Sequence, residues 1–155
     1  MFVYSLRAST LRFFGVIAVS LVVLITLITL VPTHAEGSEE TASYNYEKVK
    51  NEDDAENFLA QFGWTVDATP VEIKQVTIPS EFDKIFSAYN EIQKEQGLNL
   101  LKYKNKKITR YTFEVKNYDG YEGRVLANVL VYRNKVVGGD ICSADVNGFV
   151  HGFEK

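Results

Sequence analysis

An uncharged stretch near the N-terminus constrains this chain more than any other feature of its sequence. Phe13 to Val31 are 19 consecutive residues without a charged side chain. As an α-helix, the stretch would be roughly 28 Å long, close to the hydrocarbon thickness of a bilayer of about 30 Å. Arg7 and Arg12 precede it, and acidic residues follow from Glu36 onward. Because basic flanks stay in the cytoplasm, the sequence predicts a cytoplasmic segment 1–12, a single-pass transmembrane helix over 13–31 and an extracytoplasmic C-terminal part.

A cleaved secretory signal is the alternative interpretation of the same stretch. Thr33-His34-Ala35 resembles a small-residue cleavage site, and Pro32 before it suits the end of a helix. Signal cores usually span about 7–15 residues, so the longer stretch here favours an uncleaved anchor in the cell membrane. Cleavage after Ala35 would instead make the protein secreted. Both interpretations place the C-terminal part outside the cytoplasm.

The acidity of the chain is concentrated after this stretch. Eight acidic residues and two lysines lie within 36–57, and the remainder is nearly neutral, which disfavours a nucleic-acid partner. Residues 36–50 lack apolar periodicity, so 32–50 are predicted to form an acidic, solvated stalk. A domain over 51–155 follows. Since Cys142 is the only cysteine, an intramolecular disulfide is excluded, and the domain must depend on its hydrophobic core.

Two amphipathic helices are predicted in the domain. The first begins after the N-cap residue Asn51, carries acidic residues in its first turn and ends at Gly63. Its apolar stripe consists of Ala55, Phe58, Leu59 and Phe62. The second is expected to be capped by Ser80, with Asp83 as the capping-box acid, and to end at Gly97.

Alternation of apolar and polar residues indicates the strands. They are predicted over 71–78, as an edge strand, and over 107–116, 124–132 and 136–146. Asn147-Gly148 indicates a turn into a short final strand within 149–153. The order helix, strand, helix, strand, strand, strand predicts an α+β fold, in which two helices pack on one face of a mostly antiparallel sheet.

Several short motifs are similar to those of an uncharacterised bacterial family. They are Gln61-Phe62-Gly63-Trp64, Ile78-Pro79-Ser80-Glu81-Phe82-Asp83, Tyr89-Asn90, Gln96-Gly97, Arg110-Tyr111-Thr112 and the C-terminal run VVGGDICSADVNGFVHGF. Over about residues 58–153, the chain resembles the domain of unknown function 4830 family. The resemblance implies a hydrophobic segment ahead of the domain, and it implies no activity.

Cys142 is a candidate nucleophile, with His151 as the candidate base and Asp140 or Asp145 to orient it. A cysteine hydrolase or transferase needs a thiolate, an imidazole within about 3 Å and backbone N–H groups for the oxyanion. A chain reversal at Asn147-Gly148 would bring Cys142 near His151. However, no nucleophile elbow or glycine-rich loop adjoins Cys142 in the sequence, and a lone cysteine in a strand is usually a small buried apolar residue.

Asp140 and a lysine cluster are the candidates for ligand binding. Asp140 follows two glycines that permit a bulge, on a strand face where a carboxylate is costly unless it is hydrogen-bonded. It is expected to accept backbone or tyrosine hydrogen bonds, and the alternative is that it lines a ligand groove. Lys104, Lys106 and Lys107 form a basic cluster that suits anionic lipid headgroups or cell-wall polymers, or a solvated loop. Tyrosines expected at exposed positions add a further hint of recognition: Tyr44, Tyr46, Tyr118 and Tyr121.

Neither a metal nor another cofactor is expected. Asp140, Asp145 and His151 would supply one nitrogen ligand, whereas zinc sites usually have more nitrogen or sulfur donors. The predicted anchor and the lack of a catalytic set indicate a non-catalytic binding or interaction module at the cell envelope. Its expected partners are the membrane, through 13–31, and an envelope protein or cell-surface ligand. A cysteine-dependent hydrolase or transferase is the alternative.

Overall fold

The computed structural model describes residues 43–145 and 147–155. The predicted transmembrane helix at 13–31, the cleavage site after Ala35 and the stalk up to residue 42 lie outside these residues. Within the described part of the chain, no helix combines the length and the apolar character needed to cross a membrane. Residues from Tyr44 to Lys155 form one unit.

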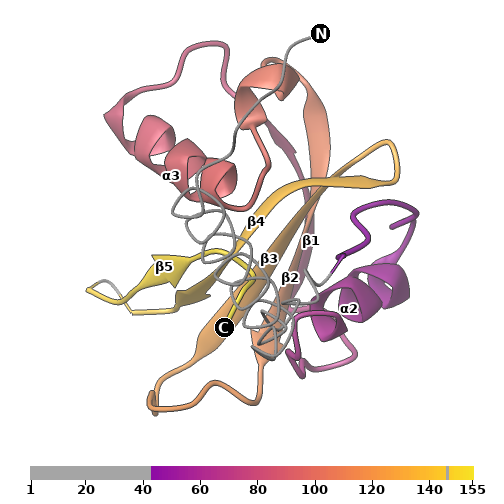
Figure 1. Cartoon of the computed structure of the whole chain (residues 1–155), viewed down its shortest axis with the longest axis vertical. Coiled ribbons are helices and arrows are strands. Elements are labelled where there is room, and N and C mark those ends of the chain that lie inside the picture. Colours follow the sequence, from indigo (N-terminus) through magenta and orange to yellow (C-terminus); the bar gives the residue numbers. More distant parts are fainter. Residues whose placement is uncertain (1–42, 146) are drawn as a thin grey trace, which may run out of the picture. The chain divides into compact units, whose positions relative to one another are not determined.

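A five-stranded antiparallel sheet is the centre of this unit, and the strands follow one another in the sheet as they do in the chain (Figure 1). They are β1 (Glu72–Thr77), β2 (Lys107–Val115), β3 (Val125–Tyr132), β4 (Lys135–Ser143) and β5 (Val150–His151). Arg133 and Asn134 both have a positive φ, as the tight β3–β4 hairpin turn requires. The predicted meander is confirmed, and β1 is an edge strand as expected.

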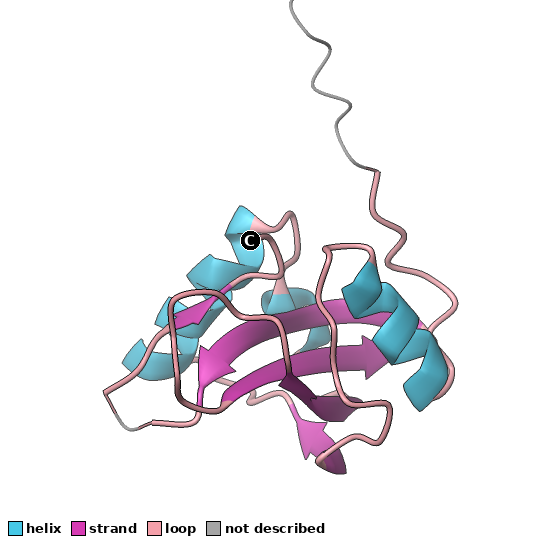
Figure 2. Cartoon of the chain, turned by 90° about the horizontal axis from the view of Figure 1, so that it is seen from below, coloured by secondary structure: helices cyan, strands magenta, loops and turns pink. Residues whose placement is uncertain are grey.

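Two α-helices accompany the sheet (Figure 2). They are α2 (Glu52–Ala60) and α3 (Lys84–Glu95), and a 3₁₀ turn, η1 (Leu100–Tyr103), precedes β2. The side chain of Asn51 accepts a hydrogen bond from the Asp54 amide at 2.9 Å, which confirms it as the N-cap of α2. Helix and antiparallel sheet together confirm the α+β class.

The predicted start of the second helix is wrong. Asp83, rather than Ser80, is the N-cap of α3, and its carboxylate accepts from the Phe86 amide at 2.7 Å. Asp83 has extended backbone angles, which the residue before a helix needs. The preceding bend packs Phe82 against Phe86, with ring centroids 4.5 Å apart, so the chain enters the helix three residues later than the capping-box pattern suggests.

The two helices pack on opposite faces of the sheet, so the prediction that they share one face is wrong. Successive residues of a strand point to opposite faces. Phe113 of β2 belongs to the hydrophobic cluster that contains Phe58 of α2. Ile108 of the same strand, which points the other way, belongs to a separate cluster with Phe86 of α3. Apart from Asn128, strand β3 is apolar on both faces, because both are covered.

Residues 44–50, predicted as the end of the stalk, instead pack on the domain. Val49 is 3% exposed, and Tyr44 stacks on Phe62 with ring centroids 4.0 Å apart. Glu47 forms a β-bridge with Lys135 at the start of β4. The positive φ of Lys48 interrupts the alternation of buried residues, which is why the segment shows no regular apolar pattern in the sequence. The domain therefore begins at Tyr44 rather than at residue 51.

Candidate functional site

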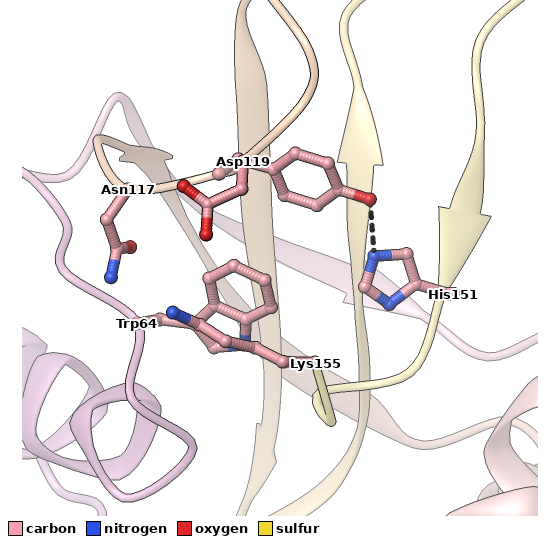
Figure 3. A pocket seen from close by; sticks show the side chains of 6 residues that line it. Trp64, Asn117, Asp119, His151 and Lys155 are labelled. Atoms are coloured by element: carbon pink, nitrogen blue, oxygen red, sulfur yellow. Dashed lines mark hydrogen bonds between the residues drawn. The ribbon is translucent and has the colours of Figure 1, made fainter.

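A pocket rich in aromatic side chains lies beside β5, and we call it the aromatic pocket. It has a volume of about 210 Å³. Its lining residues are Trp64, Asn117, Tyr118, Asp119, His151 and Lys155 (Figure 3). They come from three separate segments: the chain after α2, the β2–β3 connection, and the C-terminal end with β5.

A stack of aromatic rings forms the wall of this pocket. Trp64 and Tyr118 are almost parallel, with ring centroids 5.7 Å apart, and Tyr118 stacks in turn on Phe149 at 4.7 Å. The indole N–H of Trp64 donates to the carbonyl of Phe153 at 2.6 Å, which fixes the orientation of the ring. Rigid aromatic surfaces of this kind provide large contact area at a low cost in side-chain entropy.

The imidazole of His151 holds Tyr118 in place. Its Nδ1 lies 2.7 Å from the carbonyl oxygen of Gly152, and its Nε2 lies 3.1 Å from the hydroxyl of Tyr118 (Figure 3). A carbonyl can only accept, so Nδ1 is the donor to Gly152, and Nε2 shares the second hydrogen bond with the Tyr118 hydroxyl. Both nitrogens are therefore engaged within the protein.

A cation already occupies one face of the indole. The Nζ atom of Lys155 lies 4.7 Å from the centroid of the Trp64 ring, within the range of a cation–π contact. Lys155 thereby helps to cover Trp64, which is only 5% exposed. Asp119 contributes an exposed carboxylate to the same pocket. The half-exposed ring of Tyr118 is therefore the aromatic surface that this pocket presents, with the charged groups of Asp119 and Lys155 beside it.

Asp140 lies in a second pocket, on the α3 face of the sheet, which we call the polar groove. The groove has a volume of about 300 Å³, and its polar lining includes Tyr89, Arg110, Asn128 and Asp140. Asp140 is 5% exposed and accepts hydrogen bonds from the Tyr89 hydroxyl at 2.6 Å and from Nδ2 of Asn128 at 2.9 Å. The predicted tyrosine hydrogen bond is thus present, and the carboxylate also lines a groove. Burial, together with the charge of Asp140, raises the pKa of Tyr89 well above its ordinary value.

Gly139 allows neighbouring groups to approach the backbone of β4 closely, as predicted from the two successive glycines before Asp140. The register of the β3–β4 pair shifts between Leu130 and Val131. A Cβ atom on Gly139 would lie 2.2 Å from the carbonyl oxygen of Asn128 and 2.2 Å from the Phe153 ring. The Gly139 amide donates to the side-chain oxygen of Gln93 at 2.8 Å. Helix α3 is therefore fastened to β4 beside Asp140.

The predicted proximity of Cys142 and His151 is wrong. In the β4–β5 pair, His151 is opposite Ile141 and Val150 is opposite Cys142. Residues opposite each other share a face, so Cys142 and His151 point to different faces of the sheet. Burial and the charge of Asp140 raise the pKa of the Cys142 thiol to about 12. The thiolate that a nucleophile requires is therefore scarce at neutral pH.

The lysine cluster lies apart from both pockets. Lys104, Lys106 and Lys107 are exposed between η1 and the start of β2, and none lines the aromatic pocket or the polar groove. Nζ of Lys104 lies 5.4 Å from the ring centroid of Phe82. In the described ranges, no group of three or more His, Cys, Asp or Glu residues is placed to hold a metal ion.

The sequence hinted at the aromatic pocket without locating it. Tyr118 was singled out as an exposed turn tyrosine, and it does line the pocket. The sequence gives no comparable signal for Trp64, because nothing in its neighbouring residues links it to the C-terminal residues. Tyr44 and Tyr46 pack against the core, as Tyr118 does, but they do not line this pocket.

The structure defines a class of protein: a small α+β domain with an antiparallel meander, one helix on each face and an aromatic pocket at the C-terminal strand. Residues 58–141, more than half of the chain, match the family described as Domain of unknown function (DUF4830). The chain belongs to this family. No curated protein and no solved structure matches the chain.

Proposed function

We propose that the protein is a membrane-anchored, extracytoplasmic binding module that holds one sugar ring of a cell-envelope polysaccharide in the aromatic pocket. The observation that carries the proposal is the half-exposed ring of Tyr118 in the pocket, which stacking on Trp64 and Phe149 holds in a fixed orientation. The uncharged stretch at 13–31, with basic residues before it and acidic residues after it, supports the anchor and the orientation.

The size of the pocket favours one unit of a larger ligand. Its volume of about 210 Å³ is below the range of roughly 300–1,000 Å³ that is usual for whole small molecules. A sugar ring presents polarised C–H groups on its flat face, and these are attracted to the negative face of an aromatic ring. The carboxylate of Asp119 lies beside the stack, where it can accept hydrogen bonds from ring hydroxyls.

The pocket supports binding better than catalysis. The two nitrogens of His151 contact Gly152 and Tyr118, so this imidazole is not poised as a general base. Cys142 points to the other face of the sheet. A cysteine-dependent reaction therefore has no supporting arrangement among the residues that the structure describes.

Fluorescence titration tests the binding role directly, because Trp64 is the only tryptophan of the chain. The full chain in detergent micelles would be titrated with soluble disaccharide fragments of peptidoglycan. We expect a saturable change in emission, and we expect Tyr118→Ala to weaken the affinity about tenfold or more, as loss of an aromatic anchor does. Tyr103→Ala, which lies in the α3-side cluster, is the matched control and should bind like the wild type.

Two results would contradict this proposal. One is an emission spectrum that does not respond to the fragments up to about 10 mM, a concentration at which even a weak site would be filled. The other is a Tyr118→Ala variant that binds as tightly as the wild type. The anchor is tested separately by mass spectrometry of the membrane fraction. An intact N-terminus supports it, and a protein that begins at Glu36 supports the cleaved signal instead.

A further inference from the structure

The polar groove differs from the aromatic pocket in position and in chemistry. It lies between α3 and strands β1 to β4, and it joins the buried carboxylate of Asp140 and the half-buried Arg110 to apolar walls. We propose that the groove binds an α-amino acid with an apolar side chain, with Arg110 holding the carboxylate and Asp140 the ammonium group. This inference goes beyond the proposed sugar-binding role and does not depend on it.

Arg110 has an unused hydrogen-bond donor at the groove. Its Nη2 atom is ion-paired with Glu72. Its Nε atom is buried and has no hydrogen-bond partner among the described residues. A buried N–H group without an acceptor is costly, and such groups are usually satisfied by a ligand, an ion or water. A carboxylate is the acceptor that a guanidinium binds most strongly.

Asp140 supplies the opposite charge. The Tyr89 hydroxyl and the Asn128 amide both donate to it, so the two neighbours fix the orientation of the carboxylate. A carboxylate has about four acceptor positions, so lone pairs remain for a third donor. Because Asp140 is only 5% exposed, an ammonium group would interact with it in a medium of low dielectric constant.

The electrostatics of the groove select a zwitterion. A simple anion would be repelled by Asp140, and a simple cation would leave the buried Nε donor of Arg110 without an acceptor. A ligand with one charge of each sign meets both needs: its carboxylate accepts from Nε of Arg110, and its ammonium group pairs with Asp140. The α-amino acid is the smallest biological ligand with this pattern.

The remaining lining accounts for the side chain of the ligand. Val76 and Ile78 of the β1 side, Phe86 of α3 and Leu130 of β3 give the groove apolar walls. Its volume of about 300 Å³ is at the lower end of the usual range of roughly 300–1,000 Å³ for small-molecule sites. A single amino acid with a branched or aromatic side chain matches that size.

Calorimetric titration of the full chain in detergent micelles with L-leucine tests this site. The matched probes are 4-methylpentanoate, which lacks the amino group, and 3-methylbutylamine, which lacks the carboxylate. We expect saturable binding of L-leucine and at least about tenfold weaker binding of either analogue, because 4-methylpentanoate leaves Asp140 without its cation and 3-methylbutylamine leaves Nε of Arg110 without its acceptor. The fluorescence of Trp64 should not change, since it lies in the other pocket.

Two variants assign the binding to the groove. Arg110→Lys keeps the charge but loses the planar guanidinium, and should weaken L-leucine binding about tenfold or more. Arg124→Lys is the matched control, because Arg124 is ion-paired with Glu114 outside the groove and should bind like the wild type. Val76→Phe fills the groove from the edge strand without touching the polar network, and should abolish binding while the circular dichroism spectrum stays native.

Three outcomes would overturn the proposal. The first is no binding of L-leucine up to about 10 mM. The second is equally tight binding of 4-methylpentanoate, which would make the groove an anion site and remove the role of Asp140. The third is wild-type affinity in both folded variants, Arg110→Lys and Val76→Phe. None of these outcomes bears on the fluorescence titration of the aromatic pocket, so the two proposals fail separately.

Discussion

The thiol of Cys142 is predicted to react slowly with iodoacetamide in the folded protein. A pKa of about 12 leaves very little thiolate at pH 8. The native protein should therefore be alkylated about a hundredfold or more slowly than the protein unfolded in guanidinium chloride. Mass spectrometry of timed samples measures both rates. Equal rates in the two states would show that Cys142 is an accessible, ordinary thiol.

Alkaline pH should destabilise the fold through Tyr89 and Cys142. Both pKa values are raised in the folded protein, so the folded state holds these protons more tightly than the unfolded state does. The stabilising contribution is complete below the unfolded pKa values of about 9 to 10 and is lost as the pH rises above them. Urea denaturation from pH 7 to 11 should show a decline that is shallower in the Tyr89→Phe variant. An identical decline in that variant would contradict the role of Tyr89.

Replacing Asp140 with alanine should be strongly destabilising. The substitution leaves the Tyr89 hydroxyl and the Asn128 amide without their acceptor inside the protein. Each unsatisfied buried group costs about 1–3 kcal/mol, so the free energy of unfolding should fall by roughly 2–4 kcal/mol. Tyr89→Phe removes only one donor and should cost about 1 kcal/mol. Chemical denaturation compares the two, and a similar loss in both would argue against a shared acceptor.

At the scale of elements, the sequence pattern and the structure disagree on the N-cap of α3: the pattern suggests Ser80, and the structure has Asp83. Asp83→Ala removes the acceptor of the Phe86 amide and should lower the free energy of unfolding by about 1 kcal/mol. Ser80→Ala, at the cap position that the sequence suggests, should change it by no more than about 0.5 kcal/mol. Urea denaturation of the two variants measures both values. A larger loss in Ser80→Ala than in Asp83→Ala would show that Ser80 is the cap.

Patterns among neighbouring residues predicted most helices and strands. They did not predict which face of the sheet each helix covers, because that depends on packing between distant segments. The Asn51 cap, the alternation along β2 and β3 and the turn after Tyr132 depend on neighbouring residues, so they are readable in sequence. Which face of the sheet a helix covers depends on distant contacts. Because β3, apart from Asn128, is apolar on both faces, its sequence is compatible with either arrangement.

The same distinction applies to the sites. Asp140 was found because a buried carboxylate after two glycines is unusual in a strand. The aromatic pocket was not found, because Trp64, Tyr118 and His151 belong to distant segments that only the folded chain unites. The alternative pairing of Cys142 with His151 is not formed, for a geometric reason. Adjacent residues of a strand point to opposite faces, and His151 is opposite Ile141 rather than Cys142.

At the scale of the whole molecule, the segment 44–50 belongs to the fold. A truncated protein that begins at Asn51 should be less stable than one that begins at Tyr44, because it loses the burial of Val49 and the stacking of Tyr44 on Phe62. We expect a difference of roughly 2–4 kcal/mol in the free energy of unfolding, from the apolar area lost. Thermal and urea denaturation of the two proteins measure it. Equal stability of the two proteins would show that this segment belongs to the stalk and not to the domain.

The attachment of this segment also determines how the domain responds to tension. The amide of Val49 donates to the carbonyl of Asn134, and the amide of Val136 donates to the carbonyl of Tyr46. A pull on the chain ahead of Tyr44 therefore loads first the stacking of Tyr44 on Phe62, and then the bonds that hold the segment to the β3–β4 hairpin. Because these contacts are loaded one after another, we expect the segment to detach from the domain before the sheet itself unfolds.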